Sequence, residues 1–123
     1  MEGKGKNIVI LGAGESGVGA AILAKKQGWN VLVSDGGKIK DSFKFELEAN
    51  AITWEEGMHS MDLVLNADLI IKSPGIPDKV TLIQSIKAKG IKIISEIESL
   101  RNSLDVTANR KRENLTDMKK RNY

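Results

Sequence analysis

Cysteine is absent from this 123-residue sequence, which excludes a disulfide framework and a cysteine-based metal site. Long apolar runs are also missing. None approaches the ~18 residues of a membrane span, and the run Ile8–Leu11 is shorter than the ~7–15 residues of a secretory signal core. These absences favour a cytoplasmic protein.

Two kinds of catalytic apparatus are missing as well. A P-loop requires Gly-x-x-x-x-Gly-Lys-Ser/Thr, but Ile39 follows Gly37-Lys38, and no glycine stands five residues before Gly37. No metal-ligand spacing is present, and the only histidine, His59, has no partner at a spacing typical of a catalytic set. We therefore expect His59 to be a surface loop residue and Glu55-Glu56 to be surface charges rather than paired catalytic carboxylates.

Positive charge is concentrated at one end of the sequence. Residues 1–100 carry 12 lysines and arginines against 13 acidic residues, whereas residues 101–123 carry 7 against 3. The basic segment has no apolar periodicity, no aromatic interleaving and no nucleic-acid motif. We expect residues 99–123 to be a loose polar tail, and we expect neither nucleic acid nor a membrane as a partner.

Short apolar runs alternate with helix-forming segments over the rest of the chain. Runs of this kind, bounded by glycine and polar residues, are typical of parallel strands that helices cover on both faces. The predicted strands are Asn7–Leu11, Val31–Val33, Ile52–Trp54, Leu69–Ile71 and Ile91–Ile94, and the predicted helices are Ser16–Gln27, Asp41–Asn50, Met61–Asn66 and Val80–Lys89. This order predicts an α/β domain over residues 1–98, with a Rossmann-like, doubly wound, five-stranded parallel sheet.

A glycine motif, Gly12-x-Gly14-x-x-Gly17, joins the first predicted strand to the first helix. Gly12 permits the tight turn, Gly14 lets phosphate oxygens approach the backbone, and Gly17 lets the helix pack close to the sheet. Backbone N–H groups and the helix dipole then attract phosphate. The Ser16 hydroxyl could add a hydrogen bond and also stands where an N-cap is useful. The alternative is a turn required only for packing.

Asp35 ends the second predicted strand, 18 residues after Gly17. A carboxylate ~20 residues past such a motif is typical of ribose binding, and it could accept hydrogen bonds from ribose hydroxyls or from a base N–H. The alternative is a solvated turn aspartate beside Gly36-Gly37.

The tripeptide Ser73-Pro74-Gly75 follows the fourth predicted strand. Ligands of open α/β sheets bind at the carboxyl ends of the strands, where the strand order reverses, and the first and fourth strands are expected to flank that point. The alternative, which is compatible with binding, is a type II turn with proline second and glycine third.

Four segments together resemble the D-glutamate-adding members of the Mur ligase family, which act in bacterial peptidoglycan (cell-wall) synthesis. They are Asn7–Gly17, Val33–Asp35, Ala67–Pro77 and Ile94–Glu98. The Ser-Pro-Gly-Ile-Pro string within the third segment is the most telling, because dinucleotide dehydrogenases do not typically share it. The resemblance covers about residues 6–98.

The resemblance implies a UDP-sugar-binding first domain whose ligand is UDP-N-acetylmuramoyl-L-alanine. It implies that Glu15 and Ser16 meet the diphosphate, that Asp35 meets the uracil end, and that Ser73, Pro74 and Gly75 line the uridine pocket. ATP and magnesium are expected only for the full-length family member. Residues 99–123 lack the family's ATP loop, so the chain looks truncated and is expected to have no ligase activity by itself.

Two other interpretations stay open. An NAD-binding Rossmann module would share the glycine turn and the ribose-binding acid, and preference for UDP over NAD would separate it from the ligase domain. The third interpretation is a non-catalytic nucleotide-binding fragment whose basic tail holds a partner.

One position departs from the pattern of the Mur ligases that this sequence resembles. Gly36-Gly37 stands where the resemblance implies larger polar residues that line the uracil pocket, and this difference bears on the affinity for the base.

Overall fold

Strands and helices alternate along the chain in the computed structural model, which describes residues 5–73, 75–76 and 80–94. The strands are β1 (Asn7–Leu11), β2 (Asn30–Asp35), β3 (Thr53–Glu56), β4 (Leu69–Lys72) and β5 (Lys92–Ile94), and the helices are α1 (Glu15–Lys26), α2 (Asp41–Ala49), α3 (Met61–Val64) and α4 (Thr81–Ala88). Every predicted element is present, with bounds within two residues of those expected. The proposed tail and the end of the predicted domain lie outside the described residues.

The five strands form one parallel sheet in the order β3-β2-β1-β4-β5. The chain adds strands on one side of β1 as far as β3 and then returns to the other side with β4. The reversal point between β1 and β4 is therefore where sequence reasoning expected it. The doubly wound prediction is confirmed.

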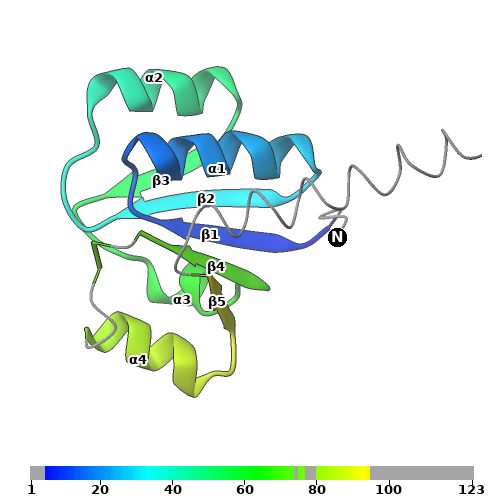
Figure 1. Cartoon of the computed structure of the whole chain (residues 1–123), viewed down its shortest axis with the longest axis vertical. Coiled ribbons are helices and arrows are strands. Elements are labelled where there is room, and N and C mark those ends of the chain that lie inside the picture. The colour runs from blue at the N-terminus through cyan, green and yellow to red at the C-terminus, as the bar shows by residue number, and fades with distance from the viewer. Residues whose placement is uncertain (1–4, 74, 77–79, 95–123) are drawn as a thin grey trace, which may run out of the picture.

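Helices cover both faces of the sheet, α1 and α2 on one side and α3 and α4 on the other (Figure 1). The alternation of side chains along β1 matches these two layers. Ile8 and Ile10 belong to the apolar cluster under α1 and α2, whereas Val9 and Leu11 belong to the cluster under α3 and α4. Each of these four side chains is almost fully buried and contributes about 1.5–3 kcal/mol to folding. Strand β1 therefore supplies side chains to both apolar cores.

Glycine ends two of the helices, as the sequence predicts. Gly28 follows α1 with a φ of 91°, and Gly90 follows α4 with a φ of 79°. This left-handed conformation is the usual helix stop, and glycine adopts it without a steric penalty. The stop after α1 turns the chain directly into Trp29, which is buried in the core.

No helix within the described ranges has both the length and the apolar character needed to cross a membrane.

Candidate functional site

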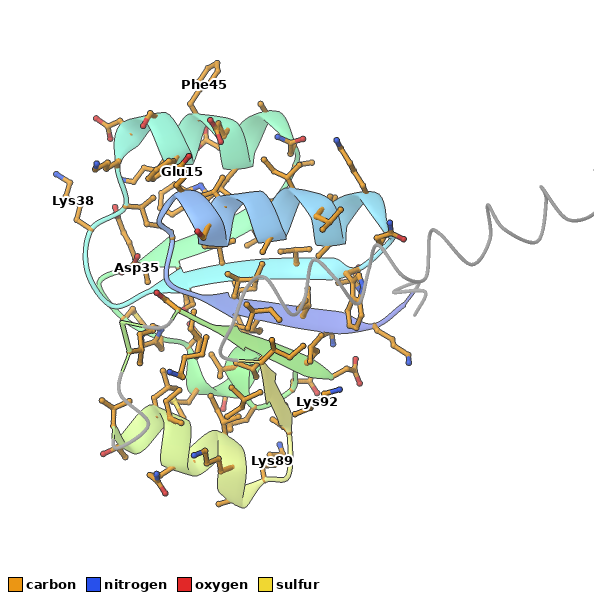
Figure 2. All side chains as sticks on the ribbon, in the orientation of Figure 1. Glu15, Asp35, Lys38, Phe45, Lys89 and Lys92 are labelled. Atoms are coloured by element: carbon orange, nitrogen blue, oxygen red, sulfur yellow. The ribbon has the colours of Figure 1, made fainter. Side chains whose placement is uncertain are left out.

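A cleft of about 520 Å³ opens at the carboxyl ends of β1, β2 and β4. It is lined by Gly12, Ala13, Gly14, Asp35, Gly36, Gly37, His59, Ser73, Ile76, Val80 and Leu82. In Figure 2, Glu15 and Asp35 lie at this end of the sheet, whereas Lys89 and Lys92 lie toward the other end. The glycine turn, Asp35 and Ser73, which the sequence predicts to share a site, therefore meet at one cleft of a size typical of small-molecule sites.

Gly12 begins the tight turn from β1 to α1, and this turn lies between the ends of β2 and β4. Its φ is 102°, and a Cβ at this position would lie 2.9 Å from the Ser73 Cβ. Its N–H donates to the Ser34 carbonyl at 2.9 Å, while the Ser73 N–H donates to the Leu11 carbonyl at 3.0 Å. The positive φ and the close Ser73 side chain both exclude larger residues at this position. The two hydrogen bonds fix the turn to β2 and to β4.

Gly14 and Gly17 face opposite environments. A Cβ on Gly17 would lie 2.1 Å from the Gly12 carbonyl oxygen, whereas a Cβ on Gly14 would meet nothing within 4 Å. The close-packing role predicted for Gly17 is confirmed. Gly14 is open to the cleft, and its lack of a side chain is not needed for packing within the described part of the chain.

The first turn of α1 presents backbone N–H groups at the cleft end of the sheet. The Val18 N–H donates to the Gly14 carbonyl at 2.9 Å, so the amides of Glu15, Ser16 and Gly17 come before that bond. Such N-terminal amides, together with a partial positive charge of about half a unit, favour anions. The expectation that Ser16 caps the helix is wrong, because α1 begins one residue earlier and Gly14 is the N-cap, without a side-chain bond.

Asp35 is tied to the glycine turn rather than loosely solvated. Its Oδ2 accepts the Ala13 N–H and its Oδ1 accepts the Gly37 N–H, each at 2.8 Å. An ionised carboxylate has about four acceptor positions, so these two bonds leave capacity for a ligand. Asp35 therefore positions both the glycine turn and the Gly36-Gly37 segment of the same cleft.

The chain turns back on itself directly after β4. The Ile76 N–H donates to the Ser73 carbonyl at 3.0 Å, and the buried Lys72 reaches the Ile76 carbonyl with its Nζ. Ser73 and Ile76 line the cleft, and Gly75 beside them is exposed. The remaining member of the predicted tripeptide, Pro74, lies outside the described residues.

His59 is the site residue that sequence reasoning missed. It was expected to be a surface loop residue without a partner, but it is half-buried and its Nδ1 lies 2.7 Å from the Oγ of the fully buried Ser34. Ser34 also donates to Glu55 Oε2 at 2.6 Å. The spacing of these residues along the sequence carries no signal, because the parallel register of β2 on β3 is what places Ser34 beside Glu55.

This cluster is not a nucleophilic triad. In such triads the imidazole lies between the hydroxyl and the carboxylate, whereas here Ser34 lies between His59 and Glu55. The Ser34 side chain is also fully buried and cannot reach a substrate. The arrangement is suited to fixing the histidine ring rather than to attacking a bond.

Glu55 and Glu56 have separate partners and do not form a catalytic pair. Glu56 accepts from Lys44 Nζ at 2.6 Å and from the Ile39 N–H at 2.7 Å. Glu55 accepts from the N–H and the hydroxyl of Ser60, each at 2.6 Å, in addition to Ser34. Both glutamates therefore anchor loops to β3, which is a more structural role than the surface charges expected from the sequence.

Burial of the Glu55 carboxyl by itself raises its pKa, but hydrogen bonds from Ser34 and Ser60 outweigh burial and hold the pKa below its ordinary value. A carboxylate of this kind stabilises the fold above its unfolded pKa, near 4.5, and the contribution is lost as the pH falls through the lowered folded pKa. We expect Glu55→Gln to reduce the urea midpoint at neutral pH, with a deficit that shrinks below about pH 4.5. Urea unfolding of both proteins across this range measures it.

The exposed Glu48 of α2 provides the control variant, Glu48→Gln, which should leave the midpoint close to wild type throughout. A Glu55→Gln deficit that stays constant from neutral to acid pH would contradict this account of Glu55.

Comparison with known proteins places the chain in a defined group. A family model described as the MurD-like N-terminal domain of Mur ligases matches residues 6–95. UDP-N-acetylmuramoylalanine–D-glutamate ligase of Bacteroides thetaiotaomicron is 58% identical over 93 residues, which are 76% of this chain and 21% of the relative. The enzyme of the same name from Christiangramia forsetii is 55% identical over 94 residues, with the same coverage. The chain thus spans about a fifth of the length of these curated relatives.

Solved structures show the same fold. A pseudomurein peptide ligase type C from Methanothermus fervidus aligns with a TM-score of 0.66 and 28% identity, over 76% of this chain and 19% of that protein. A murein peptide ligase from Psychrobacter arcticus aligns with a TM-score of 0.65 and 26% identity, over 73% of this chain and 19% of that protein.

Proposed function

The chain belongs to the Mur ligase family, as a MurD-like N-terminal domain, and we propose that this domain binds UDP-N-acetylmuramoyl-L-alanine through its uridine diphosphate. The observation that carries the proposal is the convergence of the α1 N-terminus, Asp35 and the Ser73 turn on one cleft. Positive helix ends and free amides favour the diphosphate, and the Asp35 carboxylate offers acceptors to a nucleoside.

Each cleft residue has a proposed role. The Gly14, Glu15 and Ser16 amides bind the diphosphate, with Gly12 and Gly17 shaping the turn that presents them. The Asp35 carboxylate, already oriented by two backbone N–H groups, accepts from the uridine end. The segment Ser73–Gly75, including Pro74, lines the wall of the uridine pocket.

The complete ligase reaction is proposed only for a longer protein that contains this domain. Curated relatives in which the matched region makes up only 21% of the length carry the name of a D-glutamate ligase, and the ATP-dependent step with magnesium is proposed to require parts beyond the matched residues 6–95. We propose that residues 1–98 are the UDP-sugar-binding domain and that it works in the cytoplasm.

An amide NMR titration of the chain tests the binding proposal. With UDP-N-acetylmuramoyl-L-alanine we expect shifts at Gly14, Glu15, Ser16 and Gly17 and at Asp35 and Ser73, because a bound diphosphate and uridine would change the surroundings of these amides. A parallel titration with NADH should leave them unshifted. Shifts with NADH alone would overturn the proposal in favour of a dinucleotide module, and a well-dispersed spectrum unaffected by either ligand would overturn nucleotide binding.

A further inference from the structure

The His59 ring reaches from the buried interior to the cleft. Its Nδ1 contacts Ser34 at 2.7 Å, and its Nε2 lies 3.2 Å from the point that a Cβ on Gly36 would occupy. The ring lines the cleft together with Asp35 and Gly36. Because position 36 is a glycine, it places no side chain of its own between the Nε2 and the cleft.

The hydrogen bonds behind the ring decide which nitrogen carries the proton. Glu55 is ionised at neutral pH and can only accept, so the single Ser34 proton must lie in the 2.6 Å contact with Glu55. The Met58 carbonyl is 3.5 Å from Ser34 Oγ, too far to compete for that proton. Ser34 Oγ therefore accepts from His59, whose Nδ1 must be protonated. In the neutral ring Nε2 is then a bare acceptor.

The cleft consequently presents two acceptors beside the Gly36-Gly37 segment, the Asp35 carboxylate and the His59 Nε2. We propose that His59 is a ligand-contacting, specificity-determining residue whose Nε2 accepts a hydrogen bond from a donor on the nucleoside of the bound nucleotide. This inference rests on the proposed function. Two donors have the required chemistry: a ribose hydroxyl, and the imide N–H of a uracil-type base. A base with an acceptor at that position, such as cytosine, would be disfavoured.

Two substitutions test the roles of the two ring nitrogens separately. Asn carries an amide at the place of Nδ1, so His59→Asn keeps a donor for Ser34 and removes Nε2. Gln carries its amide at the place of Nε2, so His59→Gln restores an acceptor at the cleft. With UDP as the ligand, followed by amide NMR, we expect the Kd to rise about tenfold for His59→Asn and by less than about threefold for His59→Gln. Met58→Ala, an exposed neighbour in the same loop, should bind as wild type does.

Analogues of UDP then identify the donor. The Kd difference between wild type and His59→Asn should vanish for N3-methyl-UDP if the base N–H is the partner, or for a 2′-deoxy or 3′-deoxy analogue if a ribose hydroxyl is. A difference that persists through all three analogues overturns the proposal. Equal weakening in Met58→Ala also overturns it, because the loop rather than the ring would then be responsible.

The ring nitrogens give a direct readout that does not depend on the variants' folding. His59 is the only histidine in the sequence, so its imidazole ¹⁵N signals need no assignment. At about pH 8 we expect Nδ1 to be protonated, Nε2 to be bare, and the Nε2 signal to move when UDP is added. A ring protonated at Nε2 overturns the proposal. Wild-type protein that binds no UDP overturns the proposed function as well, whereas UDP binding that His59→Asn leaves unchanged overturns only the role of His59.

Discussion

Gly14→Ala is expected to weaken UDP binding at least about tenfold while changing the free energy of unfolding by no more than about 1 kcal/mol, the scale of an N-cap substitution. The two effects separate because a Cβ on Gly14 meets nothing within 4 Å in the folded chain, and the φ of −84° suits any L-residue. The same Cβ would project from the N-cap of α1, where the proposed diphosphate must approach the backbone. The larger cost therefore falls on ligand binding and only a small one on the fold.

The measurement is a UDP titration of wild type and Gly14→Ala beside urea unfolding of both. Ser16→Ala serves as the matched control, since it removes an exposed hydroxyl from the same turn but leaves every backbone amide in place. Its affinity loss should be the smaller of the two. Wild-type affinity in Gly14→Ala would show that the α1 N-terminus does not hold the phosphates.

Gly17→Ala is expected to destabilise the fold by about 3 kcal/mol, at the upper end of the range for overpacking. Alanine is the better helix former by about 1 kcal/mol, yet its Cβ would lie 2.1 Å from the Gly12 carbonyl oxygen. That atom is backbone, and Gly12 is itself held by a bond to the Ser34 carbonyl. Relief therefore requires α1 to move away from the sheet, which disturbs the core packing of Val18 and Ile10.

Urea unfolding measures this loss, and a thermal scan should show a midpoint lower by roughly 4–8 °C per kcal/mol. Ser16→Ala again gives the baseline, with a change within about 0.5 kcal/mol. If Gly17→Ala were as stable as wild type or more so, helix propensity would outweigh the contact, and the close approach of α1 to the turn would not constrain this position.

Local chemistry made much of the fold predictable. The apolar runs Asn7–Leu11 and Leu69–Ile71 predict buried strands, because consecutive apolar side chains point to both faces of a strand and neither face can be exposed to water. Both segments are strands in the interior of the sheet. Gly28 and Gly90 mark helix ends because few other residues adopt a positive φ at low cost. The pairing of β1 with β4 was predictable as well, since the glycine turn and the segment after β4 both belong at the point where the strand order reverses.

Helix N-caps were harder to predict, because a helix that begins one residue earlier or later has a different residue at its N-cap. Ser16 is a better N-cap by residue type than Gly14, yet α1 begins at Glu15. The reason lies outside the helix. Asp35 holds the Ala13 N–H, and Gly12 is bonded to the Ser34 carbonyl, so β2 sets where the turn ends and the helix starts.

The amino-acid sequence by itself determined the alternating strands and helices, the glycine turn after β1 and the acid at the end of β2, because each depends on neighbours within a few residues. Tertiary structure alone decided that Ser34 joins His59 to Glu55 across separations of 25 and 21 residues. That contact needs the parallel register of β2 on β3 and the path of the loop after β3. A histidine that looks isolated along the chain becomes an oriented acceptor in the cleft, since hydrogen bonding depends on distance in space and not on spacing in sequence.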